Sequence, residues 1–242
     1  MKKAASFALG CKVNQYESEA IAELFAEKGY EIVGIDEEAD VYVINTCTVT
    51  NFGDKKSRQL IRKVKRQNEN AIVAVVGCYA QTAPKELMEI AGVNLVIGTK
   101  DRAQIVEMVE QYDRANGVEN HVSDIMKERV FEPLSIQKLA NRTRAYLKIQ
   151  DGCSQYCSYC IIPYARGPIR SREPQEVVAE VKRLAENGFK EVVLTGIHVA
   201  SYGKDRRDTS LLDILKQVHE VEGIERIRFS SIEPNVVTEE FA

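Results

Sequence analysis

The sequence predicts an α/β protein made of two consecutive parallel-sheet units. Short apolar runs rich in β-branched residues alternate with helical patterns over residues 1–112, and the alternation restarts at Arg144 after a polar stretch. Strands that alternate with helices form parallel, doubly wound sheets, because each helix returns the chain across the sheet. We therefore predict a first unit over residues 1–112, a connector over 113–143 and a second unit over 144–242.

Four strands and four helices are expected in the first unit. The strand patterns fall on Ala4–Leu9, Val41–Ile44, Ala71–Val76 and Leu95–Ile97, and the helical patterns fall on Ser18–Lys28, Lys55–Gln67, Pro84–Ile90 and Ala103–Tyr112. Gly29 follows the first helix and Pro84 opens the third, as glycine and proline commonly do at helix ends. Residues 113–143 are polar with little periodicity, which indicates a connector.

The second unit shows the order βαβαβ. Its expected strands are Ala145–Ile149, Glu191–Leu194 and Arg226–Phe229, and its expected helices are Pro174–Glu186 and Ser210–Val221. A further helix is expected to begin at Thr238. Three strands do not close a barrel, so we expect the chain to be part of a longer protein.

Composition narrows the function classes. Lys and Arg number 33 and Asp and Glu number 36, so the net charge of −3 gives no global attraction for nucleic acid. The longest apolar run, Ala71–Ala80, is shorter than the ~20 residues that span a bilayer, so no membrane association is expected. The start Met1-Lys2-Lys3 resembles a lipoprotein signal ending at Cys11, but the apolar stretch between them is short and fits a first strand equally well. We expect a cytoplasmic protein with reduced thiols.

Three of the six cysteines each follow a predicted strand. They are Cys11, Cys47 and Cys78. The carboxyl ends of neighbouring parallel strands share one rim, which is where open α/β sheets bind ligands, so these cysteines are expected to meet there. The alternative is that each is an ordinary buried thiol.

The other three cysteines form a Cys-x3-Cys-x2-Cys loop. Cys153, Cys157 and Cys160 follow the first strand of the second unit, the position where barrel enzymes place catalysis. Three thiolates can bind three irons of a cubane cluster and leave the fourth iron open. Zinc is the alternative, but a zinc finger needs a fourth ligand, and neither His198 nor His219 has finger spacing.

These segments resemble a known enzyme family. The string from Gly152 to Gly167, followed by Arg170-Ser171-Arg172, resembles the radical S-adenosylmethionine (SAM) methylthiotransferases, and so do Leu9-Gly10-Cys11, Asn45-Thr46-Cys47 and Gly77-Cys78. The resemblance covers residues 4–242 and implies that the second unit is the first part of a radical-SAM, partial TIM-like barrel. The string Cys11-Lys12-Val13-Asn14-Gln15-Tyr16-Glu17-Ser18 resembles the type that acts on threonylcarbamoyladenosine in tRNA, because the other types usually read Cys-Gln-Met-Asn or Cys-Pro-Lys-Asn there.

The resemblance implies a reaction and its cofactors. A methylthio group would be inserted at C2 of a threonylcarbamoyl-modified adenosine next to the anticodon, using SAM and two 4Fe-4S clusters. Cys153, Cys157 and Cys160 would hold the cluster that cleaves SAM, and Cys11, Cys47 and Cys78 would hold the cluster that carries the sulfur. An electron donor of the flavodoxin or ferredoxin kind and an unidentified sulfur donor are implied as partners. The family also has a remainder of the barrel and a small RNA-binding domain that this sequence lacks.

Further residues are expected to contact SAM. They are Tyr159, Thr195, Gly196, Ser230 and Glu233. Tyr159 is the aromatic residue before the third cysteine, and the others follow predicted strands, where the alternative is an ordinary strand-end turn or cap. His198 is expected to be a satisfied loop histidine. No catalytic side chain is assigned, since radical chemistry belongs to the cofactor.

A local basic patch is the expected RNA contact. The expected contacts are Lys55, Arg58, Arg62 and Lys65 on one helix face and Arg166 and Arg170 beside the cysteine loop. A solvated helix face and ion pairs within the loop are the respective alternatives. For the whole chain the alternatives are a methylthiotransferase for isopentenyl-adenosine in tRNA or for a ribosomal-protein aspartate, and a zinc-stabilised RNA-binding module without enzymatic activity.

Overall fold

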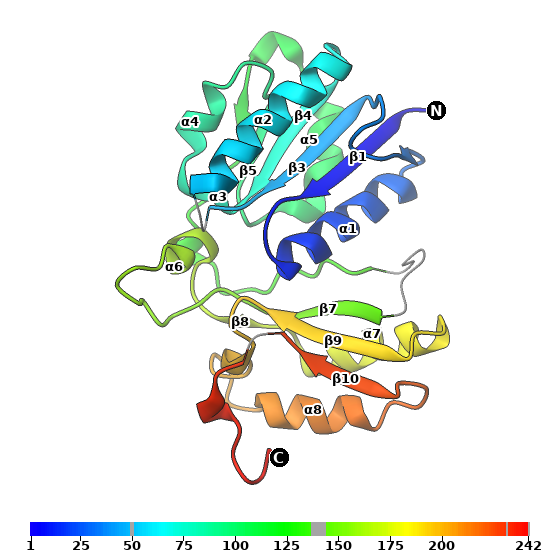
Figure 1. The fold of residues 1–242 in the computed structure, drawn as a ribbon, viewed down its shortest axis with the longest axis vertical. Coiled ribbons are helices and arrows are strands. Elements are labelled where there is room, and N and C mark those ends of the chain that lie inside the picture. Colours follow the sequence, from blue (N-terminus) through cyan, green and yellow to red (C-terminus); the bar gives the residue numbers. More distant parts are fainter. Residues whose placement is uncertain (49–50, 137–143, 231, 242) are drawn as a thin grey trace.

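Two sheets, one in each half of the chain, organise the structure (Figure 1). The computed structural model describes residues 1–48, 51–136, 144–230 and 232–241. The first sheet has six strands in the order β2-β1-β3-β4-β5-β6, and every neighbouring pair is parallel. Its strands are β1 (Lys3–Ala8), β2 (Glu31–Ile32), β3 (Val41–Thr46), β4 (Ile72–Gly77), β5 (Leu95–Ile97) and β6 (Glu119–Asn120). The predicted parallel α/β class is confirmed.

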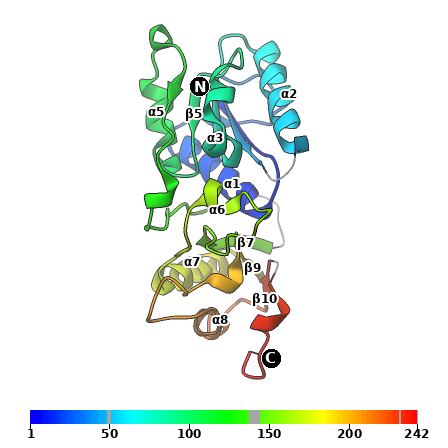
Figure 2. The ribbon, with the colours of Figure 1, turned by 90° about the vertical axis from the view of Figure 1, so that its left-hand side faces the viewer.

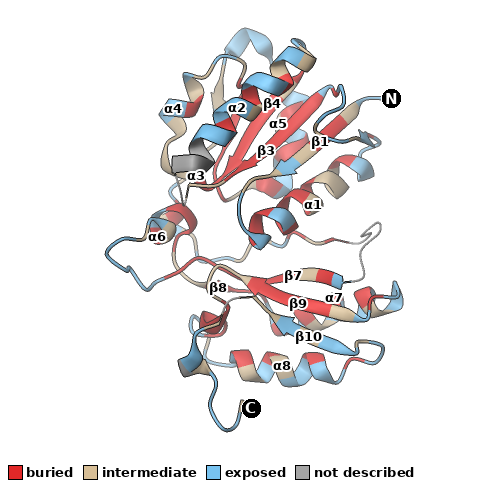
Figure 3. Ribbon diagram, in the orientation of Figure 1, coloured by how far each residue is buried: buried red, intermediate tan, exposed pale blue. Residues whose placement is uncertain are grey.

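Helices cover both faces of the first sheet, as the doubly wound prediction requires. They are α1 (Lys12–Glu27), α2 (Asn51–Gln67), α3 (Cys78–Thr82), α4 (Pro84–Met88) and α5 (Ile105–Gln111). Ile61 of α2, Tyr79 of α3 and Leu87 of α4 pack on one face. Phe25 of α1 and Ile105 of α5 pack on the other. Figure 2 shows α2 and α5 on opposite sides of the sheet, and Figure 3 shows that the central strands β3 and β4 are buried.

The second sheet has four strands in the order β10-β9-β7-β8. It comprises β7 (Arg144–Asp151), β8 (Arg170–Ser171), β9 (Glu191–Gly196) and β10 (Arg226–Phe229), with the helices α6 (Ile162–Arg166), α7 (Pro174–Glu186) and α8 (Leu211–His219). The strands β7, β9 and β10 are parallel, and β8 is antiparallel to β7. Both α7 and α8 contribute to the core on one face of this sheet.

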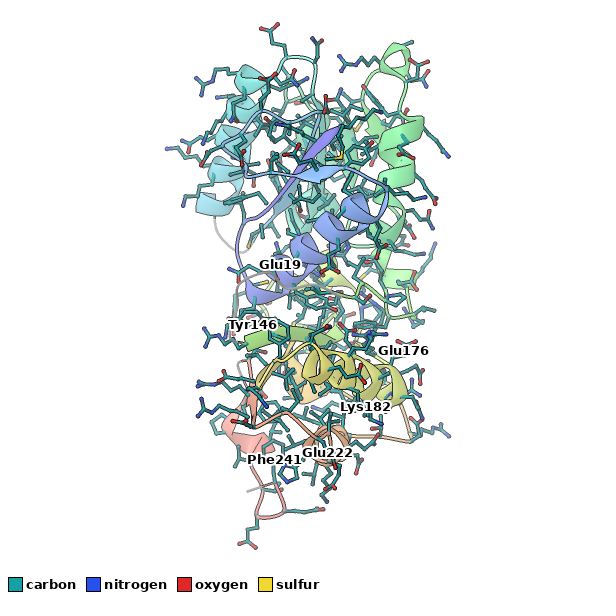
Figure 4. The ribbon with its side chains drawn as sticks, turned by 90° about the vertical axis from the view of Figure 1, so that its right-hand side faces the viewer. Glu19, Tyr146, Glu176, Lys182, Glu222 and Phe241 are labelled. Carbon is teal, nitrogen blue, oxygen red and sulfur yellow. The ribbon has the colours of Figure 1, made fainter. Side chains whose placement is uncertain are left out.

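Helix α1 of the first half packs against the second sheet. Tyr16 and Ala20 of α1 form a small core with Leu134 and Ile136 of the connecting segment, and Tyr146 of β7 packs against it. Figure 4, where Tyr146 is labelled, shows side chains filling the space between α1 and β7. The connecting segment between the sheets includes the 3-10 turns η2 (Arg114–Asn116) and η3 (Ile125–Lys127).

Helix α1 begins at Lys12, one and a half turns before the predicted start at Ser18. The predicted helix did not include these first turns, whose polar residues Asn14 and Glu17 are fully buried and bonded to groups elsewhere in the chain. The short elements β2, α3, β6, α6 and β8 were not predicted, because two to five residues carry no measurable periodicity.

Two further differences concern the predicted connector and the end of the chain. Strand β6 pairs with β5, so Glu119 and Asn120 belong to the first sheet although they lie in the predicted connector. The expected helix at Thr238 is a hydrogen-bonded turn, in which the backbone N–H of Phe241 donates to the Thr238 carbonyl at 3.0 Å. The predicted connector also includes residues 137–143, which lie outside the described residues.

Candidate metal centres

Cys11, Cys47 and Cys78 follow three adjacent strands at one end of the first sheet. Cys11 precedes α1 just after β1, Cys47 directly follows β3, and Cys78 directly follows β4 as the first residue of α3. The strands β1, β3 and β4 are neighbours in the sheet and run parallel, so their carboxyl ends share one rim. We call these three residues the first trio.

Close packing holds the loops of the first trio together. A Cβ atom placed on Gly10 would lie 2.8 Å from the sulfur of Cys47, so only glycine lets the Cys11 loop approach Cys47 this closely. The Asn14 amide joins the same loops, because its Nδ2 donates to the carbonyls of Leu9 and Thr46, each at 2.9 Å. Both carbonyls lie next to the cysteine-bearing turns.

The third member of the trio is bonded from the other half of the chain. The Nε atom of Arg166, in α6, donates to the sulfur of Cys78 at 3.1 Å. Burial raises the pKa of the Cys78 thiol to about 11, although Arg166 opposes the shift, so the metal-free thiol is protonated at neutral pH. Cys11 lies close by, because its thiol donates to Asn14 Oδ1 at 3.5 Å, the same oxygen that accepts a hydrogen bond from Arg166. A metal bound by Cys78 would displace the thiol proton, and Arg166 would then donate its hydrogen bond to a thiolate.

Cys153, Cys157 and Cys160 form a second trio at the carboxyl end of β7. Cys153 is buried, Cys160 is half-buried and Cys157 is exposed. The backbone N–H of Cys160 donates to the Cys157 carbonyl at 2.9 Å, and that of Cys153 donates to the Gly167 carbonyl at 3.0 Å. Burial raises the pKa of Cys153, and the nearby Cys160 and Cys157 add to that rise. The loop therefore brings the three thiols within electrostatic range of one another.

Helix α6 lies between the two sheets (Figure 1). Its Arg166 bonds Cys78 of the first trio, and the next residue, Gly167, bonds Cys153 of the second. Thr99, just beyond β5, donates through its hydroxyl to the Ala165 carbonyl at 2.8 Å and fixes α6 to the first sheet. The two trios are thus supported by one short helix.

The donor set of each trio fits an iron–sulfur cluster. Within residues 1–48, 51–136, 144–230 and 232–241, no three His, Cys, Asp or Glu side chains converge as a site for a single metal ion. A cubane cluster makes a different demand, because each thiolate binds a different iron and the sulfurs stand farther apart. Three thiol ligands and no fourth is the set that leaves one iron available to a ligand.

Two buried hydroxyl groups without hydrogen-bond partners lie at the carboxyl ends of β9 and β10, the two strands on one side of β7 in the second sheet. Thr195 at the end of β9 and Ser230 just after β10 have buried hydroxyl oxygens without a hydrogen-bond partner. Gly196 lies so close to Gln150 of β7 that an added Cβ would approach its Oε1 to 2.8 Å. Buried polar groups rarely lack partners, so orphaned hydroxyls beside the second trio fit a polar ligand such as SAM.

The remaining predicted SAM residues differ in their surroundings. Tyr159 is 90% exposed on the cysteine loop. Glu233 is half-exposed and lies 3.2 Å from Nε2 of His198, whose Nδ1 is 2.6 Å from the Ser201 hydroxyl. His198 is therefore satisfied, as predicted, by Ser201 within its own loop and by Glu233 beyond β10.

A buried ion network joins the two halves of the chain. Glu17 of α1 lies 2.8 Å from Lys148, 2.6 Å from Arg166 and 2.6 Å from Arg102. Asp151, at the end of β7, lies 2.8 Å from the same lysine, and 3.6 Å and 3.7 Å from Arg166 and Arg170. We call the group Glu17, Arg102, Glu132, Lys148, Asp151, Arg166 and Arg170 the interface network. It spans both halves because Glu17 and Arg102 come from the first and Lys148, Asp151 and both later arginines from the second.

The interface network corrects two of the predicted RNA contacts. Arg166 has no exposed surface and Arg170 is 3% exposed, and both face carboxylates. Neither guanidinium reaches solvent, so neither is placed on an RNA-binding surface; ion pairing around the loop, the alternative considered from the sequence, is what the structure shows.

Three of the four basic residues predicted on the face of α2 are exposed, as both the RNA contact and a solvated helix face would require. Lys55, Arg58 and Arg62 of α2 are exposed, and Arg58 pairs with Glu86 at 3.3 Å. Lys65 is half-buried and donates to the carbonyls of Glu69 and Ala71, so it supports the end of the helix instead.

Asn14 and the network residues Glu17, Arg102, Lys148 and Asp151 were not predicted as site residues. Sequence spacing shows which faces are apolar, but it does not show which polar side chains are buried against another unit. One signal was available: Asn14 and Glu17 occur in the string that carries the family resemblance.

Two family descriptions match the chain. "Uncharacterized protein family UPF0004" matches residues 3–98, and "Radical SAM superfamily" matches residues 147–242. Among solved structures, the chain resembles the radical SAM methyltransferase TsrM from Kitasatospora setae with a TM-score of 0.65 and 17% identity, covering 100% of this chain and 56% of that one. That likeness concerns the fold and confirms the partial barrel.

Curated relatives agree with the two family matches. The chain is 52% identical over 241 residues to threonylcarbamoyladenosine tRNA methylthiotransferase MtaB of Bacillus subtilis, covering 99% of this chain and 53% of the relative. It is 42% identical to the protein of the same name from Aquifex aeolicus, covering 95% and 56%. It is 34% identical to tRNA-2-methylthio-N(6)-dimethylallyladenosine synthase of Dictyoglomus thermophilum, covering 95% and 53%. The chain spans about half the length of these relatives.

The fold and the two trios define a radical SAM protein with a second cysteine site in a preceding parallel-sheet unit. The chain belongs to the radical SAM methylthiotransferase family, and within it to the MtaB type. Membership implies a 4Fe-4S cluster and SAM. No described helix is long and apolar enough to cross a membrane.

Proposed function

We propose that the chain is part of a tRNA methylthiotransferase that inserts a methylthio group at C2 of a threonylcarbamoyl-modified adenosine next to the anticodon. The 52% identity to a relative of that name over nearly the whole chain carries the proposal. The placement of two cysteine trios on either side of α6 supports it, because both clusters must act on one substrate base. A tRNA substrate and reduced thiols fit the cytoplasm.

Each trio has its own part in this proposal. Cys153, Cys157 and Cys160 hold the cluster that binds SAM, and Cys11, Cys47 and Cys78 hold the cluster that carries the sulfur. The bound cofactors supply radical and sulfur-transfer chemistry. In this proposal the Thr195 and Ser230 hydroxyls offer hydrogen bonds to SAM, and Gly196 lets the end of β9 pack closely on Gln150 beside them. Tyr159 and Glu233, whose side chains are exposed and half-exposed, are the further proposed contacts.

The unit boundaries follow from the same proposal. We assign residues 1–112 to the unit of the first trio and 144–242 to the radical SAM unit, with 113–143 between them. The first sheet and the second sheet support this division, with the qualification that β6 extends the first sheet to Asn120.

Selective loss of each trio tests the two cluster assignments. Cys157→Ala is expected to abolish both SAM cleavage and tRNA modification, because the cluster that binds SAM loses one of its three thiolate ligands. Cys47→Ala is expected to spare SAM cleavage and to stop sulfur insertion. Anaerobic reconstitution of the wild type should give about eight irons and eight sulfides per chain, since each cubane holds four of each.

The substrate is tested in cells that lack the protein. Mass spectrometry of their tRNA nucleosides should show loss of the methylthio form of threonylcarbamoyladenosine, and expression of the wild-type gene should restore it. Loss of methylthiolated dimethylallyladenosine instead would show that the protein belongs to the type that modifies isopentenyl-adenosine in tRNA. A colourless protein with one zinc per chain would support the non-enzymatic RNA-binding alternative. Full methylthiolation by Cys47→Ala would contradict the proposal that the first trio holds a cluster needed for sulfur insertion.

We infer that α2 contacts tRNA phosphates. The helix starts at Asn51, shortly after Cys47, and presents Lys55, Arg58 and Arg62 to solvent. Its exposed basic residues therefore extend from the rim that carries the first trio. Basic side chains near a reacting base hold the RNA backbone without reading its sequence.

Charge removal on α2 tests this surface. The double variant Lys55→Ala/Arg62→Ala is expected to weaken tRNA binding and to lower the slope of log K against log salt by up to about 2, since each lost phosphate contact lowers it by about 1. Lys182→Ala/Lys190→Ala is the matched control, because both lysines are exposed on the second unit, on and just after α7 (Lys182 is labelled in Figure 4). If both double variants gave the same slope of log K against log salt, α2 would not be part of the RNA interface.

A further inference from the structure

One pair of side chains supports all three cysteines of the first trio. The Asn14 Nδ2 bonds the Leu9 and Thr46 carbonyls, which adjoin Cys11 and Cys47. The Asn14 Oδ1 accepts a hydrogen bond from a terminal nitrogen of Arg166 at 2.7 Å, and Arg166 Nε reaches Cys78. Asn14 and Arg166 therefore link the three loops through direct hydrogen bonds.

Arg166 is held rigidly in this position. Besides Asn14 and Cys78, its two terminal nitrogens donate to both oxygens of Glu17, at 2.6 and 3.1 Å. A guanidinium has five donors in a fixed plane, and here that plane is shared among a carboxylate, an amide oxygen and a sulfur. A lysine at the same place would keep the positive charge, but it would not provide the planar set of donors that bonds several partners at once.

The charge of the interface network favours an anionic neighbour. Within the network as described, four cations (Arg102, Lys148, Arg166 and Arg170) face three carboxylates (Glu17, Glu132 and Asp151). A buried cation without a counter-charge is costly. The Cys78 sulfur lies against Arg166, at the edge of this excess of positive charge, where an anionic group would be favoured.

We propose that Asn14 and Arg166 are positioning residues for a cluster on the first trio, so that docking of the second unit completes the metal site of the first. This inference rests on the proposed function in one respect, the presence of a cluster on Cys11, Cys47 and Cys78. Arg166 belongs to α6 of the second unit, and its hydrogen bond to the Cys78 sulfur also acts on the cluster, because such bonds help set its reduction potential.

The test uses the reconstituted chain with SAM-independent readouts. Electron paramagnetic resonance of the reduced wild type should show two clusters, with signals assigned by their loss in Cys47→Ala and Cys157→Ala. In Arg166→Lys, the signal that Cys47→Ala removes is expected to shift to a more negative midpoint potential or to be lost with about half of the iron. In Asn14→Ala, the same signal should be lost or broadened. The signal of the second trio should stay at its wild-type potential in both variants.

Two controls separate positioning from general stability. Arg172→Lys changes another buried arginine at the interface, one that pairs with Glu180 and touches no cysteine. Asn94→Ala removes a side-chain amide that bonds Val73 and Tyr112 near the amino end of β4. Both controls should keep two clusters at wild-type potentials, even where urea unfolding shows an equal loss of stability.

Several outcomes would overturn the proposal. Two clusters with unchanged potentials in Arg166→Lys and Asn14→Ala would do so, and so would equal cluster loss in the controls. Failure of both test variants to fold, where the controls fold, would assign the pair to folding and not to the metal site. A wild type that forms only the second-trio cluster would instead contradict the proposed function, before any variant is compared.

Discussion

Glu17 pairs with cations from both halves of the chain. It has no exposed surface and lies against Lys148, Arg166 and Arg102. Burial alone would raise its pKa, but the three cations together hold the pKa of Glu17 well below its usual value. The carboxylate is therefore charged in the folded protein and compensates cations that come from both halves.

Neutralising Glu17 should be strongly destabilising. Glu17→Gln keeps the shape of the side chain but leaves buried cations without their counter-charge, and such losses cost about 3–5 kcal/mol. Urea unfolding at neutral pH measures the change in the free energy of unfolding. Glu225→Gln is the control, because Glu225 is 70% exposed and pairs with Lys190 at the surface. Glu225→Gln should lower the free energy of unfolding by less than about 1 kcal/mol. Equal effects would show that the interface network contributes little.

At the scale of elements, the turn from β4 into α3 positions Cys78. Gly77 has φ = +95° and precedes the buried cysteine, and an added Cβ would lie 2.3 Å from Asn45 Oδ1 and 2.7 Å from the Thr46 carbonyl oxygen. Glycine avoids both the backbone strain and the close contacts. The turn thereby brings β4 and the Cys47 loop together.

Gly77→Ala should therefore cost more than backbone strain alone. Gly188→Ala is the matched control, since Gly188 has φ = +88° and open space where a Cβ would stand. The control should lose about 1–3 kcal/mol from strain, and Gly77→Ala should lose more because backbone atoms must also move. Thermal melts of both variants measure this difference. Equal melting temperatures would show that the close contact is relieved without cost.

Element prediction from this sequence succeeded where burial creates a repeating pattern. The helix Pro174–Glu186 and the strand Arg226–Phe229 were predicted with the bounds that the structure shows, because their apolar spacing and flanking residues are unambiguous. Helix α6 was missed, since five residues between a cysteine loop and Gly167 hold no full repeat. Its position depends on contacts with Thr99 and Cys78, which come from distant parts of the chain.

The six cysteines were predictable for a different reason. Their positions after strands and their spacing in one loop are local in the sequence, and parallel strands bring their carboxyl ends together by rule. The arginines beside them were assigned to RNA because sequence shows charge but not burial. Arg166 makes its ion pair with Glu17 across 149 positions, a separation that no local pattern reports.

For the whole molecule, the interface network predicts acid sensitivity. The pKa values of Glu17 and Asp151 are both lowered, in each case because nearby cations outweigh the effect of burial. A carboxyl group with a lowered folded pKa binds protons more readily in the unfolded chain, so stability rises with pH below the unfolded pKa of about 4. The contribution is complete above that value and is lost as the pH falls toward the folded pKa.

Urea unfolding between pH 3 and pH 7 tests this dependence. The wild type should keep a constant free energy of unfolding down to about pH 5 and then lose stability steeply. Glu17→Gln should start lower and fall less steeply, because one of the two carboxyl groups no longer titrates. Parallel curves for the two proteins would show that Glu17 does not carry the acid sensitivity.

The interface network also bears on how the chain acquires its shape during synthesis. Glu17 leaves the ribosome long before Lys148 and Arg166, which follow 131 and 149 positions later. Amino-terminal units generally fold first as the chain emerges. The nascent first sheet must therefore keep this carboxylate in contact with water, with the start of α1 uncovered, until translation delivers the lysine and arginine that enclose it.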